Sequence, residues 1–333
     1  MSVTIKIVAD KAGVSTATVS RVFNDSAPVD DETKKRVVQV AKQLHYTPNW
    51  VGRSLSTRRS YAIGLLLPDL YGEFFSEIIR GADETAQKNH YHLLVSSSHN
   101  DRQEIEAALQ MTRGRVDGLV IMSPGIDAQT LQRNLPHTLP VLLLNCYVRG
   151  HSVDSINIDN FGGSYRMINH LLSHGHQRVA MIKGPGRNYD AAERFRGYRE
   201  ALRDSGAKHE AALELEGNFS ESSGFDAVRI LLKQGGRPDA IFAANDATAV
   251  GALSALQEAG VHVPNEIALA GFDDIPIARY LTPALSTVHA GISKLGELAI
   301  EKVLHAVRSK NIHEKEQALS PAEVVIRESC GIH

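Results

Sequence analysis

The chain has 333 residues and a formal net charge of −2, and its two cysteines, Cys146 and Cys330, are too few for a disulfide framework. No apolar stretch reaches the roughly 18 residues that a membrane span requires, and the first residues lack an apolar secretion segment. These features exclude a disulfide-rich secreted domain and a membrane protein, and they favour a reducing cytoplasm.

The segment 5–23 predicts two short helices joined by a tight turn. Four apolar residues share one face of the first helix, namely Ile5, Val8, Ala9 and Ala12. Gly13 permits a left-handed turn residue, and the hydroxyl of Ser15 can cap the second helix. That helix buries Val19 and Val22. Two short helices around a glycine turn form a helix-turn-helix, whose second helix enters the DNA major groove.

The charge distribution supports this interpretation. Residues 1–60 contain ten Lys and Arg against five Asp and Glu, about +5 in total, which leaves about −7 on the remaining residues. A basic segment on an acidic body is expected when one part of a protein meets phosphate and the other does not. Charge alone also fits a small helical domain with an ordinary positive face, so the helix-turn-helix spacing carries the argument.

A third helix is expected near residues 32–44, capped by Asp30 or Asp31. Its inward face holds Val37, Val40, Ala41 and Leu44.

A short hinge helix follows this third helix. Pro48 breaks the preceding helix, and Asn49 can cap a new one that ends near Ser56. Gly52 weakens that helix by roughly 1 kcal/mol relative to Ala. A helix of this length is marginal in water, so we expect it to fold when DNA and a partner copy hold it.

The helix-turn-helix, the corner Tyr46-Thr47-Pro48-Asn49 and the hinge Arg53-Ser54-Leu55 resemble the lactose-repressor/galactose-repressor (LacI/GalR) family of bacterial transcription regulators. The likeness covers essentially the full chain. It implies a homodimer on a near-palindromic double-stranded DNA operator, with recognition helices in the major groove and hinge leucines in the minor groove. Gly52 stands where relatives usually carry alanine, Trp50 is bulkier than usual, and Ser56 replaces a lysine found in some relatives.

Carried over by position, the expected base contacts are Thr16, Ala17, Arg21 and Leu55. Chemistry agrees, because Arg21 can fork onto a guanine and Thr16 and Ala17 can touch a thymine methyl. Leu55 matches the wedge that unstacks a base step, with plain hinge packing as the alternative. The expected phosphate contacts are Lys6, Arg53, Arg58 and Arg59, for which a solvated basic surface is the alternative.

From Tyr61 onward, short apolar runs alternate with helical patterns. The predicted strands are Ala62–Pro68, His92–Ser96, Gly118–Met122, Val141–Asn145, Val179–Lys183, Ala240–Ala244, Ile267–Phe272 and Ala322–Ile326. The predicted helices are Phe74–Asn89, Gln103–Arg113, Gly163–His174, Ala192–Ser205, Ser222–Lys233, Ala247–Ala259 and Ile292–Val307. This alternation indicates βαβ units and mostly parallel sheets flanked by helices.

About 270 residues are too many for one typical α/β layer domain. The resemblance implies an α/β, two-lobed, periplasmic-binding-protein-like body behind the all-α helix-turn-helix head. The chain would cross between the lobes near residues 160, 290 and 322. The expected boundaries are 1–46 for the DNA-binding domain, 47–60 for the hinge, 61–160 with 291–322 for the N-terminal lobe, and 161–290 with 323–333 for the C-terminal lobe.

Ligands of open α/β sheets bind beyond the carboxyl ends of the strands. The string Arg194-Phe195-Arg196-Gly197-Tyr198 resembles the family's RxxGF effector motif, and the turns at Asn245 and Asp273 match two further effector positions. Carboxylates and amides suit neighbouring hydroxyls, and a phenylalanine can serve as a plate for a sugar ring. The predicted effector contacts are Asp69, Phe74, Asp159, Arg194, Phe219, Asn245 and Asp273. Capping or lobe packing is the alternative for Asp69, Phe74 and Asp159.

These features predict a ligand-responsive transcriptional repressor that acts in the cytoplasm, on the nucleoid, with a small sugar or sugar derivative as effector. A purine or a partner protein in place of the sugar remains open. No nucleophile–base constellation suggests an enzyme, and no cofactor is expected. His170, His174 and His176 lack the cysteine or carboxylate that would complete a metal site.

Overall fold

The computed structural model describes residues 3–24, 27–46, 59–99, 101–124, 135, 139–146, 153–234, 237–309 and 315–331. The chain divides into two compact units, Met1–Tyr61 and Ala62–His333. No helix within these described ranges is both long and apolar enough to cross a bilayer.

The first unit is a three-helix domain of α1 (Ile5–Ala12), α2 (Thr16–Asn24) and α3 (Asp31–Gln43). Gly13 has a φ of 67° and ends α1 in the left-handed region. The Thr18 amide donates to Ser15 Oγ at 3.1 Å, and the Thr33 amide donates to Asp30 Oδ1 at 2.8 Å. The predicted turn and both predicted caps are therefore confirmed.

The helices of this unit meet in a small apolar core. Its buried members are Val8, Ala9, Ala12, Val19, Val22, Val37 and Ala41. Arg36 Nε donates to the carbonyl of Ala12 at 3.0 Å and so ties α3 to the end of α1. The predicted inward faces of all three helices are confirmed, with Ile5, Val40 and Leu44 partly buried at the margin of the core.

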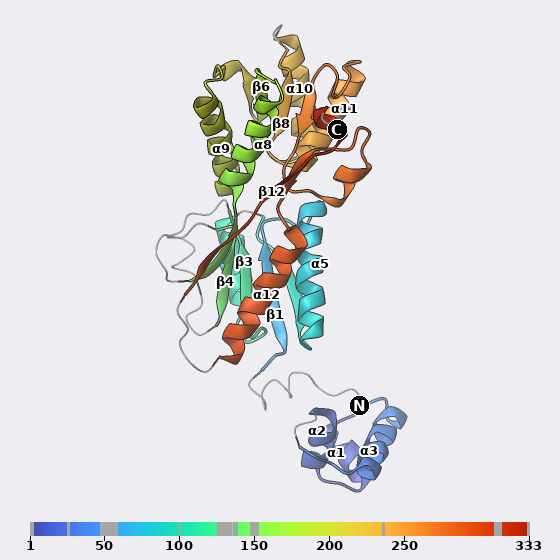
Figure 1. Cartoon of the computed structure of the whole chain (residues 1–333). Coiled ribbons are helices and arrows are strands. Elements are labelled where there is room, and N and C mark those ends of the chain that lie inside the picture. Colours follow the sequence, from blue (N-terminus) through green and yellow to red (C-terminus); the bar gives the residue numbers. More distant parts are fainter. Residues whose placement is uncertain are drawn as a thin grey trace. The chain divides into compact units, whose positions relative to one another are not determined.

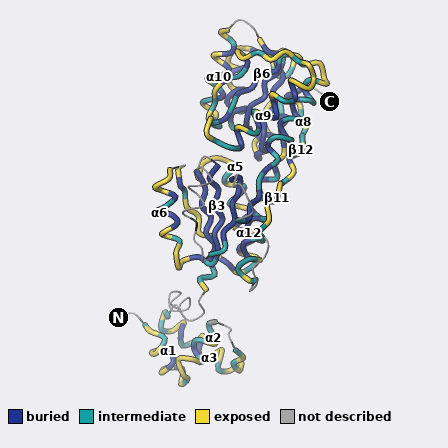
Figure 2. Tube along the Cα trace, turned by 90° about the vertical axis from the view of Figure 1, so that its left-hand side faces the viewer, coloured by how far each residue is buried: buried dark blue, intermediate teal, exposed yellow. Residues whose placement is uncertain are grey.

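The second unit contains a six-stranded parallel sheet in the order β11-β5-β4-β3-β1-β2 (Figure 1). Its strands are β1 (Ala62–Leu67), β2 (His92–Ser97), β3 (Gly118–Met122), β4 (Val141–Leu144), β5 (Asp154–Ile158) and β11 (Gln317–Ser320). Three helices accompany them: α5 (Glu73–Lys88), α6 (Arg102–Thr112) and α12 (Ile292–Arg308). The strands β1, β3 and β4 are buried along their whole length, as continuous apolar strands require (Figure 2).

A four-stranded parallel sheet, β7-β6-β8-β9, forms the other lobe of this unit. Its strands are β6 (Val179–Ile182), β7 (Glu214–Leu215), β8 (Ala240–Ala243) and β9 (Ala268–Ala270). Its helices are α8 (Asn160–Ser173), α9 (Tyr189–Ser205), α10 (Glu221–Lys233) and α11 (Asp246–Glu258). A two-stranded antiparallel ribbon of β10 (Thr287–His289) and β12 (Glu323–Val325) packs on α8.

The chain passes between the two lobes where β5 leads into α8, where β10 leads into α12, and where β11 leads into β12. The predicted α/β body with parallel sheets flanked by helices is confirmed. The strands β5, β7, β10 and β11 were not predicted. β7 and β10 have only two and three residues, β5 begins with the polar residues Asp154 and Ser155, and β11 lies at an exposed edge. Hydrogen bonds from two backbone amides of the C-terminal lobe reach the other lobe: Ile277 N donates to Glu73 Oε2 at 2.9 Å, and Tyr189 N donates to the Pro124 carbonyl at 3.1 Å.

Candidate functional site

The recognition face lies on α2. Thr16, Ala17 and Arg21 are exposed on this helix, while Val19 and Val22 on its other side are buried in the core. The amphipathic pattern therefore leaves the three predicted base readers free to meet a base edge. Their role in base contact stays a prediction.

Two of the four predicted phosphate contacts lie among the described residues. Lys6 is exposed on α1, and Arg59 is exposed just before β1. Arg53, Leu55 and Arg58 lie outside the described residues.

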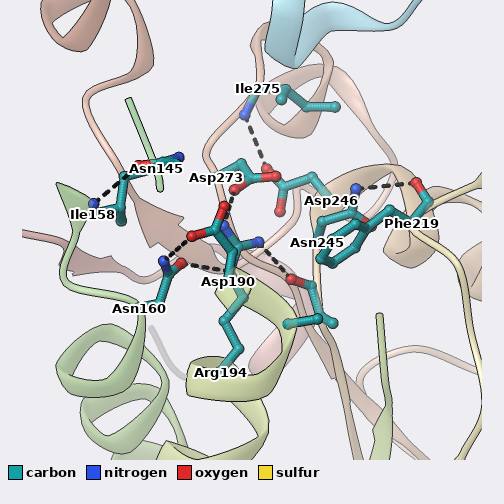
Figure 3. A network of polar contacts seen from close by, with 12 residues as sticks. Asn145, Ile158, Asn160, Asp190, Arg194, Phe219, Asn245, Asp246, Asp273 and Ile275 are labelled. Atoms are coloured by element: carbon teal, nitrogen blue, oxygen red, sulfur yellow. Dashed lines mark hydrogen bonds and ion pairs between the residues drawn. The ribbon is translucent and has the colours of Figure 1, made fainter. Parts of the chain in front are cut away.

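A buried polar cluster lies where the two lobes of the second unit meet, with Arg194 at its base (Figure 3). The guanidinium is 3% exposed, and each of its nitrogens has a partner. Nε donates to Asn160 Oδ1 at 2.8 Å, Nη1 donates to the Ala244 carbonyl at 2.6 Å, and Nη2 pairs with Asp273 Oδ1 at 2.9 Å. Its Cζ lies 3.8 Å from the centre of the Phe272 ring. Hydrogen bonds and an ion pair to three segments of the C-terminal lobe thus hold the arginine side chain in place.

Asp190 joins this cluster one helical turn before Arg194 on α9. Its Oδ1 accepts from Asn160 Nδ2 at 2.7 Å, so Asn160 bridges the carboxylate and the guanidinium. The N-terminal turn that carries Asp190 is fixed by Asn188, whose side chain caps α9 at the amide of Ala191.

The buried carboxylates of this cluster hold their protons more tightly than ordinary aspartates. Burial raises the pKa of Asp190 to about 7, against the opposing effect of Arg194, and the charge of Asp273 adds to the rise. Burial raises the pKa of Asp273 to about 6, again opposed by Arg194. Burial also raises the pKa of Asp246 well above its usual range. Clustered titratable groups with perturbed pKa values are typical of functional sites.

Because the pKa of Asp190 is raised, we expect the free energy of unfolding to depend on pH. A carboxyl whose pKa rises from 3.8 to about 7 on folding costs stability as the pH rises through that window. When the pH is raised from about 5 to about 8, the free energy of unfolding of Asp190→Asn should therefore fall by about 2–3 kcal/mol less than that of the unsubstituted protein. Urea unfolding at several pH values measures this difference. If the free energies of unfolding of the two proteins changed equally with pH, Asp190 would have its ordinary pKa.

Two further predicted contacts lie beside Arg194. Asn245 caps α11 through the amide of Thr248 and donates through Nδ2 to the Phe219 carbonyl at 3.1 Å. Phe219 has a φ of 70°, and the Arg194 guanidinium lies 5.7 Å from its ring centre. Gly184 makes room for this ring, because a Cβ there would lie 2.4 Å from it. The structure thus brings Arg194, Phe219, Asn245 and Asp273 together.

The remaining predicted contacts stand apart from this cluster. Asp69 is exposed, and its Oδ1 accepts from the amides of Leu70 and Tyr71. Phe74 is half-buried in the first turn of α5, edge-on to Phe75 with ring centres 5.3 Å apart.

Asp159 also has partners of its own. One oxygen caps α8 at the amide of Gly162, and the other pairs with Arg166 at 2.9 Å. Its neighbour Asn160 is the residue that enters the cluster. Contact with an effector stays a prediction for all seven residues.

Three members of the cluster are not among the predicted effector contacts, namely Asn160, Asp190 and Asp246. Asp190 and Arg194 are four residues apart on a helix, which was a usable signal, but the predicted helix began only at Ala192. Asp246 is fully buried and accepts from Thr287 Oγ1 at 2.5 Å and from the Ile275 amide at 2.9 Å. Only the fold brings those two donors to it.

The thiol of Cys146 is buried in the apolar core of the N-terminal lobe. Burial raises its pKa to about 12, which keeps it protonated and unsuited to act as a nucleophile. Among the residues that the structure describes, no group of three or more His, Cys, Asp or Glu is arranged to hold a metal ion.

Solved structures of similar fold include the lac repressor dimer bound to operator and the anti-inducer ONPF. It shares 28% identity over 99% of each chain, with a TM-score of 0.89. A transcriptional regulator CelR–cellobiose complex also matches at 28% identity, with a TM-score of 0.75 over 98% of this chain and 99% of that one.

Proteins of similar sequence match this chain over nearly its full length. The ribose operon repressor of Haemophilus influenzae is 34% identical over 98% of both chains. The transcriptional repressor PurR of Edwardsiella ictaluri is 35% identical over 92% of this chain and 91% of that one. Residues 4–49 match the model of bacterial regulatory proteins of the lacI family, and residues 168–330 match a periplasmic binding protein-like domain. The resemblance seen in the sequence is confirmed, and the chain belongs to the lacI family of bacterial regulatory proteins.

Proposed function

We propose that this chain is a DNA-binding transcriptional repressor that binds a near-palindromic operator as a homodimer and responds to a small sugar-like effector between its lobes. The observation that carries the DNA-binding half is the exposed face of α2, with Thr16, Ala17 and Arg21 opposite the buried Val19 and Val22. One recognition helix reads only a few base pairs, so a two-fold pair of copies is needed for a specific site.

The domain boundaries that we propose are those expected from the sequence, with the head at 1–46, the hinge at 47–60 and two lobes interleaved from 61 onward. The separate compact unit Met1–Tyr61 and the two sheets of the second unit support this division. The hinge itself lies mostly outside the described residues.

The effector half of the proposal rests on the polar cluster and its place in the fold. Asn160 is the first residue after the crossing from β5, and the turn that carries Asp273 is bonded to β10, which leads into the next crossing. Asp273 N donates to the Val288 carbonyl at 2.8 Å. A ligand that engages Asp273 and Asn160 therefore acts on two of the segments that join the lobes, and it favours one lobe arrangement if it binds that arrangement better.

The choice of ligand class follows from chemistry and from the relatives. Buried carboxylates and amides beside a phenylalanine ring suit a hydroxylated ring. One relative is a ribose operon repressor, which favours a sugar, while another is the repressor PurR, so a purine is the second candidate. We propose a regulator rather than an enzyme, acting in the cytoplasm where its DNA lies.

Arg21→Ala tests the DNA-binding half. Loss of a bidentate guanine contact should cost about 1–3 kcal/mol of binding free energy and relax specificity at one operator position. Selection of bound sequences from random duplex DNA, followed by titration of the selected operator, measures both effects.

The control is Lys6→Ala, which should weaken binding to all duplexes about equally and reduce its salt dependence. An Arg21→Ala variant that binds every sequence equally weakly would show that Arg21 contacts only phosphate. If the unsubstituted protein bound no duplex sequence in preference to others, the proposal would be refuted.

A further inference from the structure

Two of the three crossings between the lobes lie side by side. In the first crossing, Asp159 is the residue that connects β5 to α8. In the second crossing, only Pro321 and Ala322 separate β11 from β12 (Figure 1). The Asp159 amide donates to the Ser320 carbonyl at 2.9 Å, so the two crossings are paired through their backbones. Movements of one lobe against another are absorbed by a few residues at the ends of such elements.

Arg166, on α8, contacts both crossings through one atom. Its Nη2 donates to Asp159 Oδ2 at 2.9 Å and to the Ala322 carbonyl at 2.6 Å. Ala322 is fully buried, and Pro321 beside it has no amide hydrogen to donate to a neighbouring strand. A charged donor forms stronger hydrogen bonds than a neutral one. Arg166 therefore attaches both crossings to the first helix of the C-terminal lobe.

The Asp159 side chain is held in the orientation that this contact requires. Its Oδ1 accepts from the Gly162 amide at 2.9 Å and so caps α8, where the helix N-terminus favours a negative charge. A Cβ on Gly162 would clash with the carboxylate, so a larger residue there would displace it. The position of the carboxylate relative to α8 is thus set before Arg166 binds to it.

The same turn of α8 carries a member of the effector cluster. Asn160 follows Asp159 directly in the chain. Its Oδ1 accepts from Arg194 Nε at 2.8 Å, and its Nδ2 donates to Asp190 Oδ1 at 2.7 Å. A planar peptide unit joins Asn160 to Asp159, so a ligand that moves one of them moves the other. The crossings that Arg166 holds therefore lie one residue from the proposed effector site.

Two hydrogen bonds between the lobes lie on other elements and can report the lobe arrangement. The Tyr189 amide donates to the Pro124 carbonyl, and the Ile277 amide donates to the Glu73 side chain. Neither bond includes Arg166 or one of its partners. A loss that stays local to Arg166 would leave both bonds intact, whereas a change in the lobe arrangement would break them.

We propose that Arg166 is a positioning residue that makes the crossings at Asp159 and at 321–322 move together and so fixes the arrangement of the lobes. Without it, the two crossings bend independently and the lobes sample further arrangements. A displacement of Asn160 then no longer moves both crossings, so the operator responds less to the effector. The inference rests on the proposed effector function and names a residue that transmits it.

Hydrogen exchange of the full chain, followed by mass spectrometry of its peptides, tests this positioning role. The variants are Arg166→Met and the conservative Arg166→Lys. Arg178→Met is the matched control, because the Arg178 side chain is similarly exposed, 39% against 46% for Arg166. Arg178 also donates to a carboxylate, that of Glu210, and to a carbonyl, that of Arg237, but within the C-terminal lobe.

In Arg166→Met, we expect the amides of Tyr189 and Ile277 to exchange about tenfold faster, because their contacts with the other lobe open more often. Arg166→Lys keeps a cationic donor and should show a smaller increase, and Arg178→Met should match the unsubstituted protein. Unchanged exchange at either amide in Arg166→Met would overturn the inference. An equal increase in Arg178→Met, or in peptides from the interior strand β8, would also overturn it, since it would reflect a general loss of stability.

Titration of the operator with and without D-ribose or hypoxanthine measures the effect on regulation. A compound that changes the operator affinity should change it at least about threefold less in Arg166→Met than in the unsubstituted protein. An equal change in both proteins would refute the regulatory role of Arg166. If neither compound changes the operator affinity of the unsubstituted protein, the proposed ligand classes are wrong, and the exchange experiment still decides whether Arg166 positions the lobes.

Discussion

Replacing Arg194 with methionine is expected to lower the free energy of unfolding of the two-lobed body by about 3–5 kcal/mol. Arg194 is the only buried cation among the described residues of this chain, and it neutralises Asp273 directly at 2.9 Å. Its removal leaves Asp273 buried without a counter-charge, beside Asp190. It also removes the donors to Asn160 and to the Ala244 carbonyl, so the hydrogen bonds that join α9 to α8 and to the start of α11 through this side chain are lost.

Urea or thermal unfolding of the full chain measures this effect, and Arg196→Met provides the control. Arg196 lies two residues further along α9, but its pair with Glu193 is on the surface. Exposed pairs contribute at most about 1 kcal/mol, so this control should unfold near the unchanged chain.

A double variant, Arg194→Met with Asp273→Asn, separates the charge from the packing. It should regain part of the lost stability, because the uncompensated carboxylate is gone. Equal losses in Arg194→Met and Arg196→Met would show that the buried ion pair does not stabilise the lobe.

Gly251→Val is expected to destabilise the C-terminal lobe by about 3 kcal/mol or more, even though it removes a glycine from a helix. The helices α10 and α11 touch through their backbones: a Cβ on Gly251 would lie 1.7 Å from the Glu221 carbonyl oxygen, and one on Gly224 would lie 2.0 Å from that of Thr248. A side chain at this place forces the helices apart. Because Asn245 caps α11, the same change should displace a proposed effector contact.

Unfolding of Gly251→Val beside Gly186→Val measures the cost of this contact. A Cβ on Gly186 would meet no heavy atom within 4 Å, so its substitution should change the stability by less than about 1 kcal/mol. Effector titration of both variants would then report the displacement of Asn245. A Gly251→Val protein as stable as the Gly186→Val control would contradict the close packing of α10 on α11.

The sequence predicted the elements that local rules govern. The glycine turn at Gly13 and the cap Ser15 were predicted from single residues, and the third-helix cap was narrowed to Asp30 or Asp31, of which the structure shows Asp30. The apolar strands β1, β3 and β4 and the amphipathic helices between them were equally accessible, because periodicity reports burial on one face or on both. Membership of the lacI family followed from motifs in the head, where a few spacings are specific.

The effector cluster was only partly accessible in this way. Arg194, Phe219, Asn245 and Asp273 were predicted and lie together, whereas Asp159 caps a helix and its neighbour Asn160 takes a place in the network. Adjacent residues at a strand–helix junction point in different directions, and the sequence carries no local signal for which one turns inward.

The sequence by itself therefore determined the two-part architecture, the exposed face of α2 and the family, because these depend on helix periodicity, capping and short motifs. Only the tertiary structure decided that Asp190, Asp246 and Asp273 share one buried place with a single arginine. Their positions come from three separate segments of the chain, and burial and mutual charge set their proton affinities.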